Sequence, residues 1–336
     1  MPDRAEMSRH FLAKAGWGDA ARAFLAGDAS DRSYDRLTRA TGTAVLMDAP
    51  PGKGDDPASF IRIAEHLHSL GLSAPRIVAK DLTAGFLLLE DLGDGIFARL
   101  VAADPETEPL LYTAATDVLL HLHRHPAPQG LDDLRPQDWA DAAAFALDWY
   151  RFAITGDHVD KTAFVATLTE VLQSHANGAR VMILRDYHAE NLLWLPERNG
   201  VGRVGLLDFQ LAQMGQRGYD LVSLLQDARR DVQQATEAAM IRHFLDNTGE
   251  SAADFSNSYA VLGAQRALRI IGIFARLCLV AGKQSYLGLI PRVWGQLQRN
   301  LAQPALRPLA KLCAEVLPPP TPENLSIIGA KCGHFR

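Results

Sequence analysis

The sequence predicts an α+β fold of two lobes, a small antiparallel-sheet lobe at the N-terminus and a larger, mainly helical lobe after it. Short β-prone runs dominate about the first ninety residues, whereas helical periodicity dominates most of the chain beyond residue 109. The chain has 336 residues, of which 48% are hydrophobic, so two lobes with packed cores can form. We expect lobes at residues 1–92 and 93–312, and a loosely attached Pro-rich tail at residues 313–336.

The N-terminal lobe contains a predicted sheet and one helix. Its predicted strands are Asp35–Arg39, Thr43–Met47, Ile77–Lys80 and Phe86–Glu90. The first two flank Ala40-Thr41-Gly42, which indicates a hairpin. Ala58–Leu70 carries apolar residues at helical spacing and stops before Gly71, which predicts an amphipathic helix. A Gly-rich joint at Asp91–Gly95 ends the lobe.

The second lobe is helical with one β insert. Its predicted helices are Pro109–His123, Trp139–Ile154, Lys161–His175 and a further series between Asp220 and Leu312. Two strand-like runs, Asn191–Leu195 and Val204–Asp208, interrupt the helical pattern. This predicts a short hairpin inside the helical lobe.

Charge and cysteine content exclude several classes of protein. A formal net charge of −5 argues against nucleic acid as a partner, because phosphate contacts need clustered Lys and Arg. The three cysteines fit neither a disulfide framework nor a zinc site, so a cytoplasmic location is expected. The N-terminus lacks an apolar signal core, and Arg276 interrupts the most apolar late run. We therefore expect neither a membrane span nor a membrane partner. A monomer is also expected.

The predicted β insert places two oxygen ligands opposite each other. Asn199-Gly200 is a strong two-residue hairpin turn, because both residues tolerate positive φ. If this turn sets the register, Asn191 faces Asp208 with Cβ atoms roughly 4.5–5.5 Å apart. Asp186 lies five residues before Asn191, on the loop that enters the same end of the hairpin. An amide and a carboxylate with open positions suit Mg²⁺, which shares phosphate oxygens, so the spacing predicts a phosphoryl-transfer site.

The same residues keep most of a known phosphoryl-transfer motif. The catalytic loop of protein kinases reads H-R-D-x-x-x-x-N and is followed by D-F-G, with the first Asp on the substrate hydroxyl and the other two residues on Mg²⁺. Arg185–Asn191 keeps R-D-x-x-x-x-N, and Asp208-Phe209-Gln210 keeps D-F with Gln for Gly. Each residue alone could instead cap a turn or end a strand. Together they predict Asp186 as the catalytic residue, and Asn191 and Asp208 as metal ligands.

These motifs resemble the aminoglycoside phosphotransferase and choline kinase family, which has the protein-kinase-like fold. Within it, the chain is similar to the bacterial anomeric kinases of N-acetylmuramate and N-acetylglucosamine, which act in peptidoglycan recycling. The segments that carry this narrower resemblance are MDAPP at Met47–Pro51, RDYHAENLL, LLDFQ, Gln265-Arg266 and Ile290–Trp294. The resemblance implies a two-lobed kinase fold with ATP between the lobes, Asp186 as the base, and Mg²⁺ on Asn191 and Asp208.

The resemblance also implies where ATP binds. The loop over the phosphates would consist of Ala29, Ser30, Asp31, Arg32 and Ser33. Small residues there would let backbone N–H groups approach an anion. Backbone groups near Glu90 and Leu92 would pair with the adenine edge at the hinge between the lobes. A plain surface turn, and a strand that ends in a turn, stay open as alternatives for the two segments.

Two residues that have structural roles in this family must be identified in this chain. Kinases carry a strand lysine that contacts the α and β phosphates, but the predicted strand Thr43–Met47 contains no Lys. Lys53 and Arg32 are possible substitutes. Asp220 stands at the start of a predicted helix, where it fits an N-cap. From the resemblance, it could also anchor the loop after Asp208.

The late helices are strongly basic, which bears on the acceptor. Residues 256–311 contain eight Lys and Arg residues and no Asp or Glu. Aminoglycosides are polycations and need carboxylates, so a neutral or acidic sugar fits this segment better. N-acetylmuramate carries a carboxylate that an Arg fork could hold, with Arg266 and Arg269 as candidates. Alternatively, these basic residues pair with acidic patches such as Asp132-Asp133 or Asp138.

Other functions remain open at this level. An aminoglycoside or choline-type kinase is one alternative, and a kinase-like module that binds nucleotide without catalysis is another. The missing strand lysine favours the module, whereas the intact Asp186, Asn191 and Asp208 favour an enzyme. A protein kinase fits poorly, because only eleven residues separate Asp208 from Asp220, too few for an activation loop. The prediction is an ATP-dependent kinase of a small molecule, with Mg²⁺ as cofactor and an amino sugar as acceptor.

Overall fold

The chain divides into two compact units that are not contiguous in sequence. The structure is a computed structural model that describes residues 3–27, 32–52 and 56–335. Unit 1 comprises residues 1–128 and 189–212, and unit 2 comprises residues 129–188 and 213–336. Residues 189–212 therefore belong to unit 1, although the chain on both sides of them belongs to unit 2. The predicted lobe boundary after residue 92 stays a prediction, since these units are defined by compactness alone.

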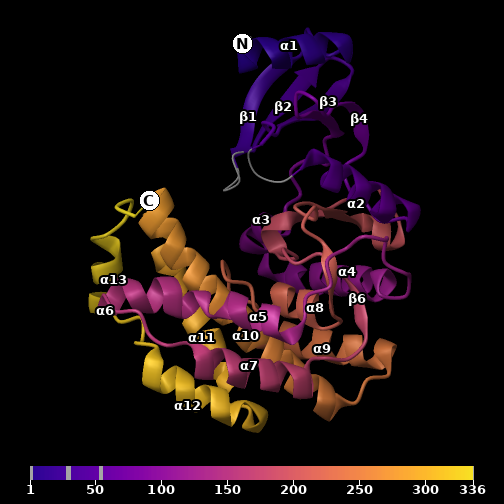
Figure 1. The fold of residues 1–336 in the computed structure, drawn as a ribbon. Coiled ribbons are helices and arrows are strands. Elements are labelled where there is room, and N and C mark those ends of the chain that lie inside the picture. Colours follow the sequence, from indigo (N-terminus) through magenta and orange to yellow (C-terminus); the bar gives the residue numbers. More distant parts are fainter. Residues whose placement is uncertain (1–2, 28–31, 53–55, 336) are drawn as a thin grey trace. The chain divides into compact units, whose positions relative to one another are not determined.

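Unit 1 is built on a five-stranded antiparallel sheet (Figure 1). In spatial order its strands are β1 (Ala21–Gly27), β2 (Ser33–Arg39), β3 (Gly42–Asp48), β5 (Phe86–Glu90) and β4 (Ile77–Asp81). The predicted hairpin is confirmed, because β2 and β3 pair from Ser33 with Asp48 to Arg39 with Gly42. The edge strand β1 is exposed along its whole length, so it lacks the alternation of apolar and polar residues by which strands are recognised in a sequence.

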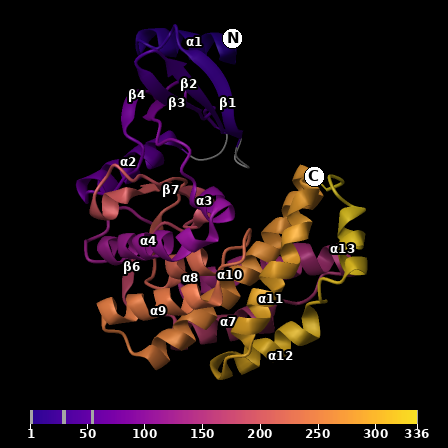
Figure 2. The same cartoon turned by 180° about the vertical axis from the view of Figure 1, so that it is seen from behind.

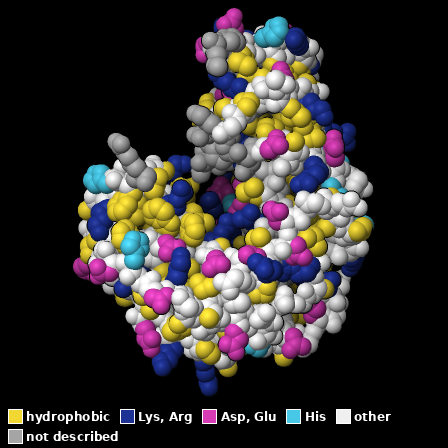
Figure 3. All heavy atoms as spheres, viewed as in Figure 1, with side chains coloured by type: hydrophobic (Ala, Val, Ile, Leu, Met, Phe, Trp, Pro, Cys, Tyr) yellow, Lys and Arg dark blue, Asp and Glu magenta, His cyan; other side chains and the backbone are white. Residues whose placement is uncertain are grey.

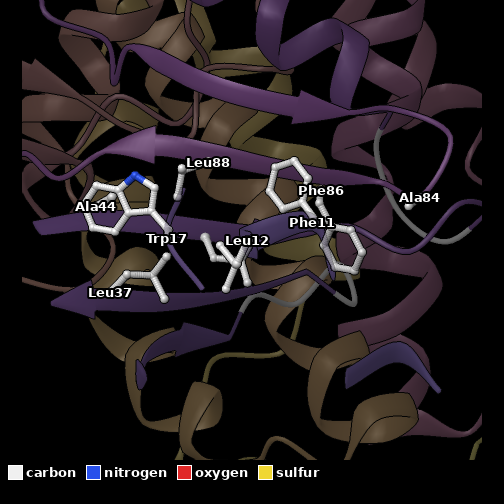
Figure 4. Close-up of a cluster of buried hydrophobic side chains, with 9 residues drawn as sticks. Phe11, Leu12, Trp17, Leu37, Ala44, Ala84, Phe86 and Leu88 are labelled. Atoms are coloured by element: carbon white, nitrogen blue, oxygen red, sulfur yellow. The ribbon is translucent and has the colours of Figure 1, made fainter. Parts of the chain in front are cut away.

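The core of unit 1 lies between the sheet and helix α1 (Arg4–Lys14), which the sequence did not predict. The buried cluster in Figure 4 consists of Phe11, Leu12, Trp17, Leu37, Ala44, Leu46, Ala84, Phe86 and Leu88. The rings of Phe11 and Phe86 stack with centroids 5.6 Å apart. The guanidinium of Arg39 lies 3.8 Å from the centre of the Trp17 ring, which shields the edge of this cluster from water.

The remaining elements of unit 1 are helices and the hairpin of the β insert. The helices are α2 (Pro57–Ser69), α3 (Phe97–Ala103) and α4 (Glu108–Leu122), with a 3₁₀ turn at Pro105–Thr107. Helix α2 begins where the Asp56 side chain accepts the N–H of Ala58 at 2.9 Å. The hairpin consists of β7 (Leu192–Trp194) and β8 (Val204–Leu206). Single bridges join it to Ser73 and Ile96, so the hairpin is fixed within unit 1.

Unit 2 is mainly helical and organised around the long helix α10 (Ala252–Ala281). The other helices are α5 (Pro136–Ala143), α6 (Phe152–Thr155), α7 (Thr162–His175), α8 (Tyr219–Leu225), α9 (Gln234–Thr248), α11 (Ile290–Leu301), α12 (Arg307–Val316) and α13 (Pro322–Gly329). Helix α10 packs against α5, α7, α8 and α11, and α11 lies alongside it in Figures 1 and 2. A two-stranded sheet of β6 (Arg180–Ile183) and β9 (Gln213–Gln216) completes the unit. The predicted α+β class, with a small antiparallel sheet and a helical remainder, is confirmed.

The predicted helix Trp139–Ile154 contains a π-helical segment, η2 (Ala146–Arg151), between α5 and α6. Helix α10 approaches this segment very closely at Gly272. A Cβ atom added to Gly272 would lie 2.3 Å from the carbonyl carbon of Phe145. Only glycine fits at this contact between the two helical segments.

The C-terminal segment is packed against unit 2, so the expected loose attachment was wrong. Tyr150 donates its hydroxyl to the carbonyl of Pro318 at 2.9 Å, and Lys331 Nζ donates to the carbonyl of Ala153 at 2.6 Å. Ile328 on α13 has no exposed surface. The prolines of the C-terminal segment start helices or lie in the connections between them, so Pro content alone did not indicate a free tail.

Basic and acidic side chains are interspersed over the visible face of unit 2 in Figure 3.

No helix within residues 3–27, 32–52 and 56–335 is both long and apolar enough to cross a membrane.

Candidate active site

The hairpin register differs by one residue from the prediction. Leu192 pairs with Leu206 and Trp194 with Val204, and the N–H of Leu207 donates to the carbonyl of Asn191 at 2.9 Å. Asn191 therefore faces Leu207, and the predicted pairing with Asp208 was wrong.

The error lies in the connection between the two strands. Asn199-Gly200 does not form a two-residue turn, because residues 200–203 form a 3₁₀ turn. The connection is closed instead by the N–H of Leu195, which donates to the carbonyl of Arg203 at 2.8 Å. The longer connection shifts the strands by one residue.

Asp208 follows the hairpin in a left-handed conformation, with φ of 55°. This conformation is uncommon for residues other than glycine, although Asp tolerates it better than most. Asp208 Oδ1 accepts Gln210 Nε2 at 2.8 Å, and Arg32 Nη2 lies 3.4 Å from the same oxygen. Phe209 is buried and stacks on Phe60 of α2, with ring centroids 4.8 Å apart. The side chain of Asp208 is thus oriented by neighbours within unit 1.

Arg32 is the basic residue that the structure places beside Asp208. Its side chain is only 3% exposed, which is rare for an arginine on a loop. Lys53, the other possible substitute for the strand lysine, lies outside the described residues.

The segment that carries Asp186 belongs to unit 2 and is held by Asp220. Asp220 accepts the N–H of Leu184 at 2.6 Å and the N–H of Arg185 at 2.9 Å. Arg185 has φ of 71°, so these bonds stabilise a strained backbone immediately before Asp186. Burial raises the pKa of Asp220 to about 7, and its two N–H donors and the charge of Arg266 oppose that rise.

The predicted role of Asp220 as an N-cap was wrong. The N-cap of α8 is Gly218, and Asp220 lies in the first turn of the helix. Its hydrogen bonds reach the loop before Asp186 rather than the loop after Asp208. The sequence placed Asp220 correctly near the site but could not show which segment it holds.

Arg266 supports the same loop from α10. It is 6% exposed, and its Nη2 donates to Ser223 Oγ at 2.7 Å. Ser223 Oγ in turn donates to the carbonyl of Arg185 at 3.3 Å. Arg269 is half-buried, and its side chain has no hydrogen bond or ion pair to the described part of the chain. The binding of an acceptor by Arg266 or Arg269 stays a prediction.

Other basic residues of the late helices form ion pairs within unit 2. Arg292 pairs with Asp231 at 2.7 Å, and Arg299 pairs with Glu237 at 2.8 Å. The acidic partners predicted from the sequence were wrong. Asp133 pairs with Arg180 and Asp138 pairs with Arg135.

Sequence reasoning missed two residues beside Asp186. His188 is buried, and Arg229 Nη1 lies 3.3 Å from its Nε2. Burial is the main reason that the pKa of His188 lies well below its ordinary value, and the charges of Arg229 and Arg266 lower it further. The run Asp227–Asp231, in which charges of both signs follow a helix directly, was the signal in the sequence that could have indicated Arg229.

The predicted ATP-binding segments are only partly described. Ala29, Ser30 and Asp31 lie outside the described residues, whereas Ser33 starts β2 and pairs with Gly27 and Asp48. Their role in ATP binding stays a prediction.

The predicted hinge residues lie in unit 1. The N–H of Glu90 donates to the carbonyl of Arg76 at 2.8 Å, and its side chain accepts Arg198 at 2.6 Å. Leu92 is half-buried. Contacts of either residue with adenine stay predictions.

The donor chemistry near Asp208 fits a magnesium ion. Asn191 and Asp208 lie at the same end of the hairpin in unit 1, and Mg²⁺ prefers carboxylate and amide oxygens. Asp186 lies in unit 2, five residues before Asn191 in the chain, so its convergence with the other two residues stays a prediction. No group of three or more His, Cys, Asp and Glu side chains in the described ranges could hold a metal by itself. Phosphate oxygens and waters would have to complete the coordination.

Comparison with known proteins establishes the family. The sequence model of the phosphotransferase enzyme family matches residues 22–255, which is more than half of the chain. The chain belongs to the phosphotransferase enzyme family. This phosphotransferase is 37% identical to the N-acetylmuramate/N-acetylglucosamine kinase of Caulobacter vibrioides, over 91% of its own length and 95% of that protein. It is 32% identical to the kinase of the same name from Pseudomonas aeruginosa, over 90% of its length and 91% of that protein.

Solved structures confirm the kinase-like fold of the phosphotransferase. A choline/ethanolamine kinase family protein from Mesorhizobium loti superposes with a TM-score of 0.61 at 14% identity, over 98% of this chain and 100% of that one. A choline kinase from Streptococcus pneumoniae gives a TM-score of 0.59 at 14% identity, over 91% of this chain and 99% of that one. The predicted enzyme class, a phosphotransferase that acts on a hydroxyl, is confirmed by the family and by the curated kinases. Membership of a kinase family implies that the phosphotransferase uses ATP.

Proposed function

We propose that this phosphotransferase is an amino-sugar kinase that transfers the γ-phosphate of ATP to the anomeric hydroxyl of N-acetylmuramate or N-acetylglucosamine. The observation that carries the proposal is its similarity to two kinases of that name over about nine-tenths of both chains. The excess of basic over acidic residues in the late helices supports a neutral or acidic acceptor and disfavours a polycationic one.

Asp186 would orient the acceptor hydroxyl and accept its proton. The segment before it is fixed by the two backbone hydrogen bonds to Asp220, so its carboxylate is presented from a rigid backbone. Rigid placement matters, because phosphoryl transfer depends mostly on positioning and electrostatic stabilisation.

Asn191 and Asp208 would hold Mg²⁺, which supplies positive charge to the β and γ phosphates when it is bound. Gln210 orients the Asp208 carboxylate through its hydrogen bond to Oδ1.

Arg32 would take the role of the absent strand lysine. Its guanidinium already lies beside Asp208, and an arginine can hold a phosphate through two parallel N–H donors. The loop of Ala29, Ser30, Asp31 and Ser33 would contact the phosphates. Glu90 and Leu92 would contact the adenine.

Cytoplasmic location and a monomeric state stay predictions from the sequence. Three alternatives remain: an aminoglycoside kinase, a choline-type kinase, and a module that binds nucleotide without catalysis. One experiment with a panel of acceptors separates them.

The proposal is tested with the purified full chain, Mg²⁺ and ATP. N-acetylmuramate, N-acetylglucosamine, kanamycin and choline are offered separately, ADP release is followed, and the products are analysed by phosphorus NMR. We expect an anomeric sugar phosphate from at least one acetylated sugar and no product from kanamycin or choline. Turnover of kanamycin or choline alone would replace the proposed acceptor. ATP binding without turnover of any acceptor would favour the module.

A further inference from the structure

The positive charge of Arg229 opposes the rise that burial causes in the pKa of Asp227. Arg229 lies beside the segment that holds Asp186. It is exposed, and among the described residues it forms no ion pair with a carboxylate, whereas Arg292 and Arg299 each do. Its Nη1 lies 3.3 Å from Nε2 of His188, which follows Asp186 by two residues. Within unit 2 this guanidinium therefore contacts the segment that presents the proposed base.

His188 positions this guanidinium. The imidazole is 5% exposed, and burial together with the charges of Arg229 and Arg266 keeps it neutral at ordinary pH through a lowered pKa. A neutral imidazole with its proton on Nδ1 accepts a hydrogen bond at Nε2, and guanidinium groups only donate. The contact therefore consumes one of the five N–H donors of Arg229 and leaves the others for a ligand.

The backbone at Arg229 is fixed on both sides. Asp227 Oδ1 accepts the N–H of Arg229 at 2.8 Å, and the carbonyl of Asp227 accepts Gln296 Nε2 at 2.9 Å. The carbonyl of Arg229 accepts Arg292 Nη1 at 3.1 Å. A backbone held in this way loses little further entropy when the side chain binds a ligand.

Three other arginines of this region already have partners. Arg266 is almost fully buried and donates to Ser223, so little of its guanidinium can reach a ligand. Arg292 and Arg299 line a cavity of about 320 Å³, but Asp231 and Glu237 neutralise them there. Arg229 differs from these three arginines because it is both exposed and without an ion pair to a described carboxylate, so its guanidinium can bind an anionic group.

We propose that Arg229 determines acceptor specificity by binding the carboxylate of an acidic amino sugar, and that Arg266 acts as a positioning residue for the loop of Asp186. The inference rests on the proposed function, since it concerns the acceptor of that kinase. N-acetylmuramate differs from N-acetylglucosamine by a lactyl ether that ends in a carboxylate. A guanidinium holds a carboxylate through two parallel charge-assisted hydrogen bonds, and the neutral sugar offers no such partner.

The test compares Arg229→Gln with the wild type on three acceptors: N-acetylmuramate, its methyl ester and N-acetylglucosamine. Charge-assisted hydrogen bonds are worth enough to change affinity about 10- to 100-fold. We expect the KM for N-acetylmuramate to rise by about that factor in the variant. The KM for the ester and for N-acetylglucosamine, and kcat for all three, should change less than about threefold, because those reactions do not use the carboxylate. Arg229→Lys keeps the positive charge but not the two parallel N–H donors. Its KM for N-acetylmuramate should therefore lie between those of the wild type and Arg229→Gln.

Arg307→Gln is the matched control, because Arg307 is an exposed arginine of unit 2 without an ion pair among the described residues, and it should leave all three acceptors unaffected. Arg269→Gln tests the other candidate that the sequence suggested for the carboxylate. An equal loss with all three acceptors, or no loss with any, would overturn the proposal for Arg229. A selective loss of N-acetylmuramate in Arg269→Gln alone would move the carboxylate site to Arg269. A wild type that phosphorylates only N-acetylglucosamine would overturn the proposal while the amino-sugar kinase stands, and a wild type inactive on both sugars would overturn both.

The proposed role of Arg266 as a positioning residue is tested with Arg266→Met. A positioning residue affects all acceptors alike, so we expect kcat to fall with both sugars while their ratio of KM values stays within about twofold. A selective rise in the KM for N-acetylmuramate in this variant would show that Arg266 binds the carboxylate instead. Circular dichroism and thermal unfolding verify that each variant is folded.

Discussion

Three side chains support the loop of Asp186 in unit 2. Asp220 and Ser223 hold the backbone of Arg185 from two sides, and Arg266 completes this support from α10. None of these three side chains is exposed. In the proposed mechanism these side chains would act through the backbone that they fix and not through contact with the acceptor.

Replacement of Asp186 by Asn tests the proposed base. The amide cannot take a proton from the acceptor hydroxyl, so we expect kcat to fall about 10²- to 10⁴-fold. Nucleotide affinity, measured by calorimetry, should stay close to that of the wild type. Asp132→Asn removes a carboxylate from an exposed residue of the same unit and should leave kcat unchanged. If the Asp186→Asn variant kept near-full turnover, Asp186 would not be the catalytic base.

His188 gives the protein a predictable dependence of stability on pH. Its pKa in the folded state lies well below the ordinary value of 6.5, mainly because the ring is buried. Below pH 6.5 the unfolded chain therefore binds a proton that the folded chain does not, and the free energy of unfolding decreases as the pH falls. The slope from one such group is at most about 1.4 kcal/mol per pH unit.

Urea unfolding of the wild type and of His188→Gln between pH 5 and pH 7.5 measures this effect. The glutamine does not titrate, so the wild type should lose stability relative to the variant as the pH falls. Parallel curves across the whole range would show that the folded imidazole titrates normally.

The sequence was most informative about single residues and least informative about their pairing. The order and spacing of Asp186, Asn191 and Asp208 were sufficient to predict the enzyme class. The register of Asn191 was missed by one residue, because the length of a connection depends on its backbone conformation and not on one Asn-Gly dipeptide. The contact between His188 and Arg229 joins residues 41 positions apart, which periodicity cannot reveal.

At the scale of elements, the segments with clear apolar spacing were predicted well, whereas helix α1 and several strands were missed. The helix at Thr162–His175 lies almost where the apolar spacing placed it. The strands Arg180–Ile183 and Gln213–Gln216 have only four residues each, too few to show alternation, so neither was predicted. The π-helical turn within Trp139–Ile154 was also invisible, because one extra residue in a turn hardly changes the apolar spacing.

The close approach of α10 to η2 provides a test with a matched control. In Gly272→Ala, the new methyl group would clash with the backbone of Phe145, and overpacking of this kind costs roughly 1–3 kcal/mol. Gly295 lies inside α11 with nothing within 4 Å of its added Cβ. Gly295→Ala should therefore stabilise the protein by about 0.5–1 kcal/mol through helix propensity. Chemical denaturation measures both changes, and equal effects of the two variants would contradict the proposed contact.

At the scale of the whole molecule, the C-terminal segment is part of the folded unit 2. Ile328 is fully buried, whereas its neighbour Ile327 is 39% exposed. Removal of buried methyl groups in Ile328→Ala should lower the free energy of unfolding by roughly 2–5 kcal/mol. Ile327→Ala, the adjacent control, should change it by less than about 0.5 kcal/mol. If neither variant loses stability, α13 contributes nothing to unit 2 and the attachment is loose after all.

The discontinuous make-up of unit 1 affects how the chain can fold while it is being synthesised. The first segment of unit 1 is complete at Pro128, but its second segment, which contains the hairpin, is finished only at Ala212, 84 residues later (212 minus 128). At translation rates of about 5–20 residues per second, this delay lasts roughly 4–17 s. During that interval Ser73 and Ile96, which bridge to the hairpin in the finished protein, have no strand to meet. The backbone groups that these two residues use in the bridges therefore stay open to water in the nascent chain until the insert arrives.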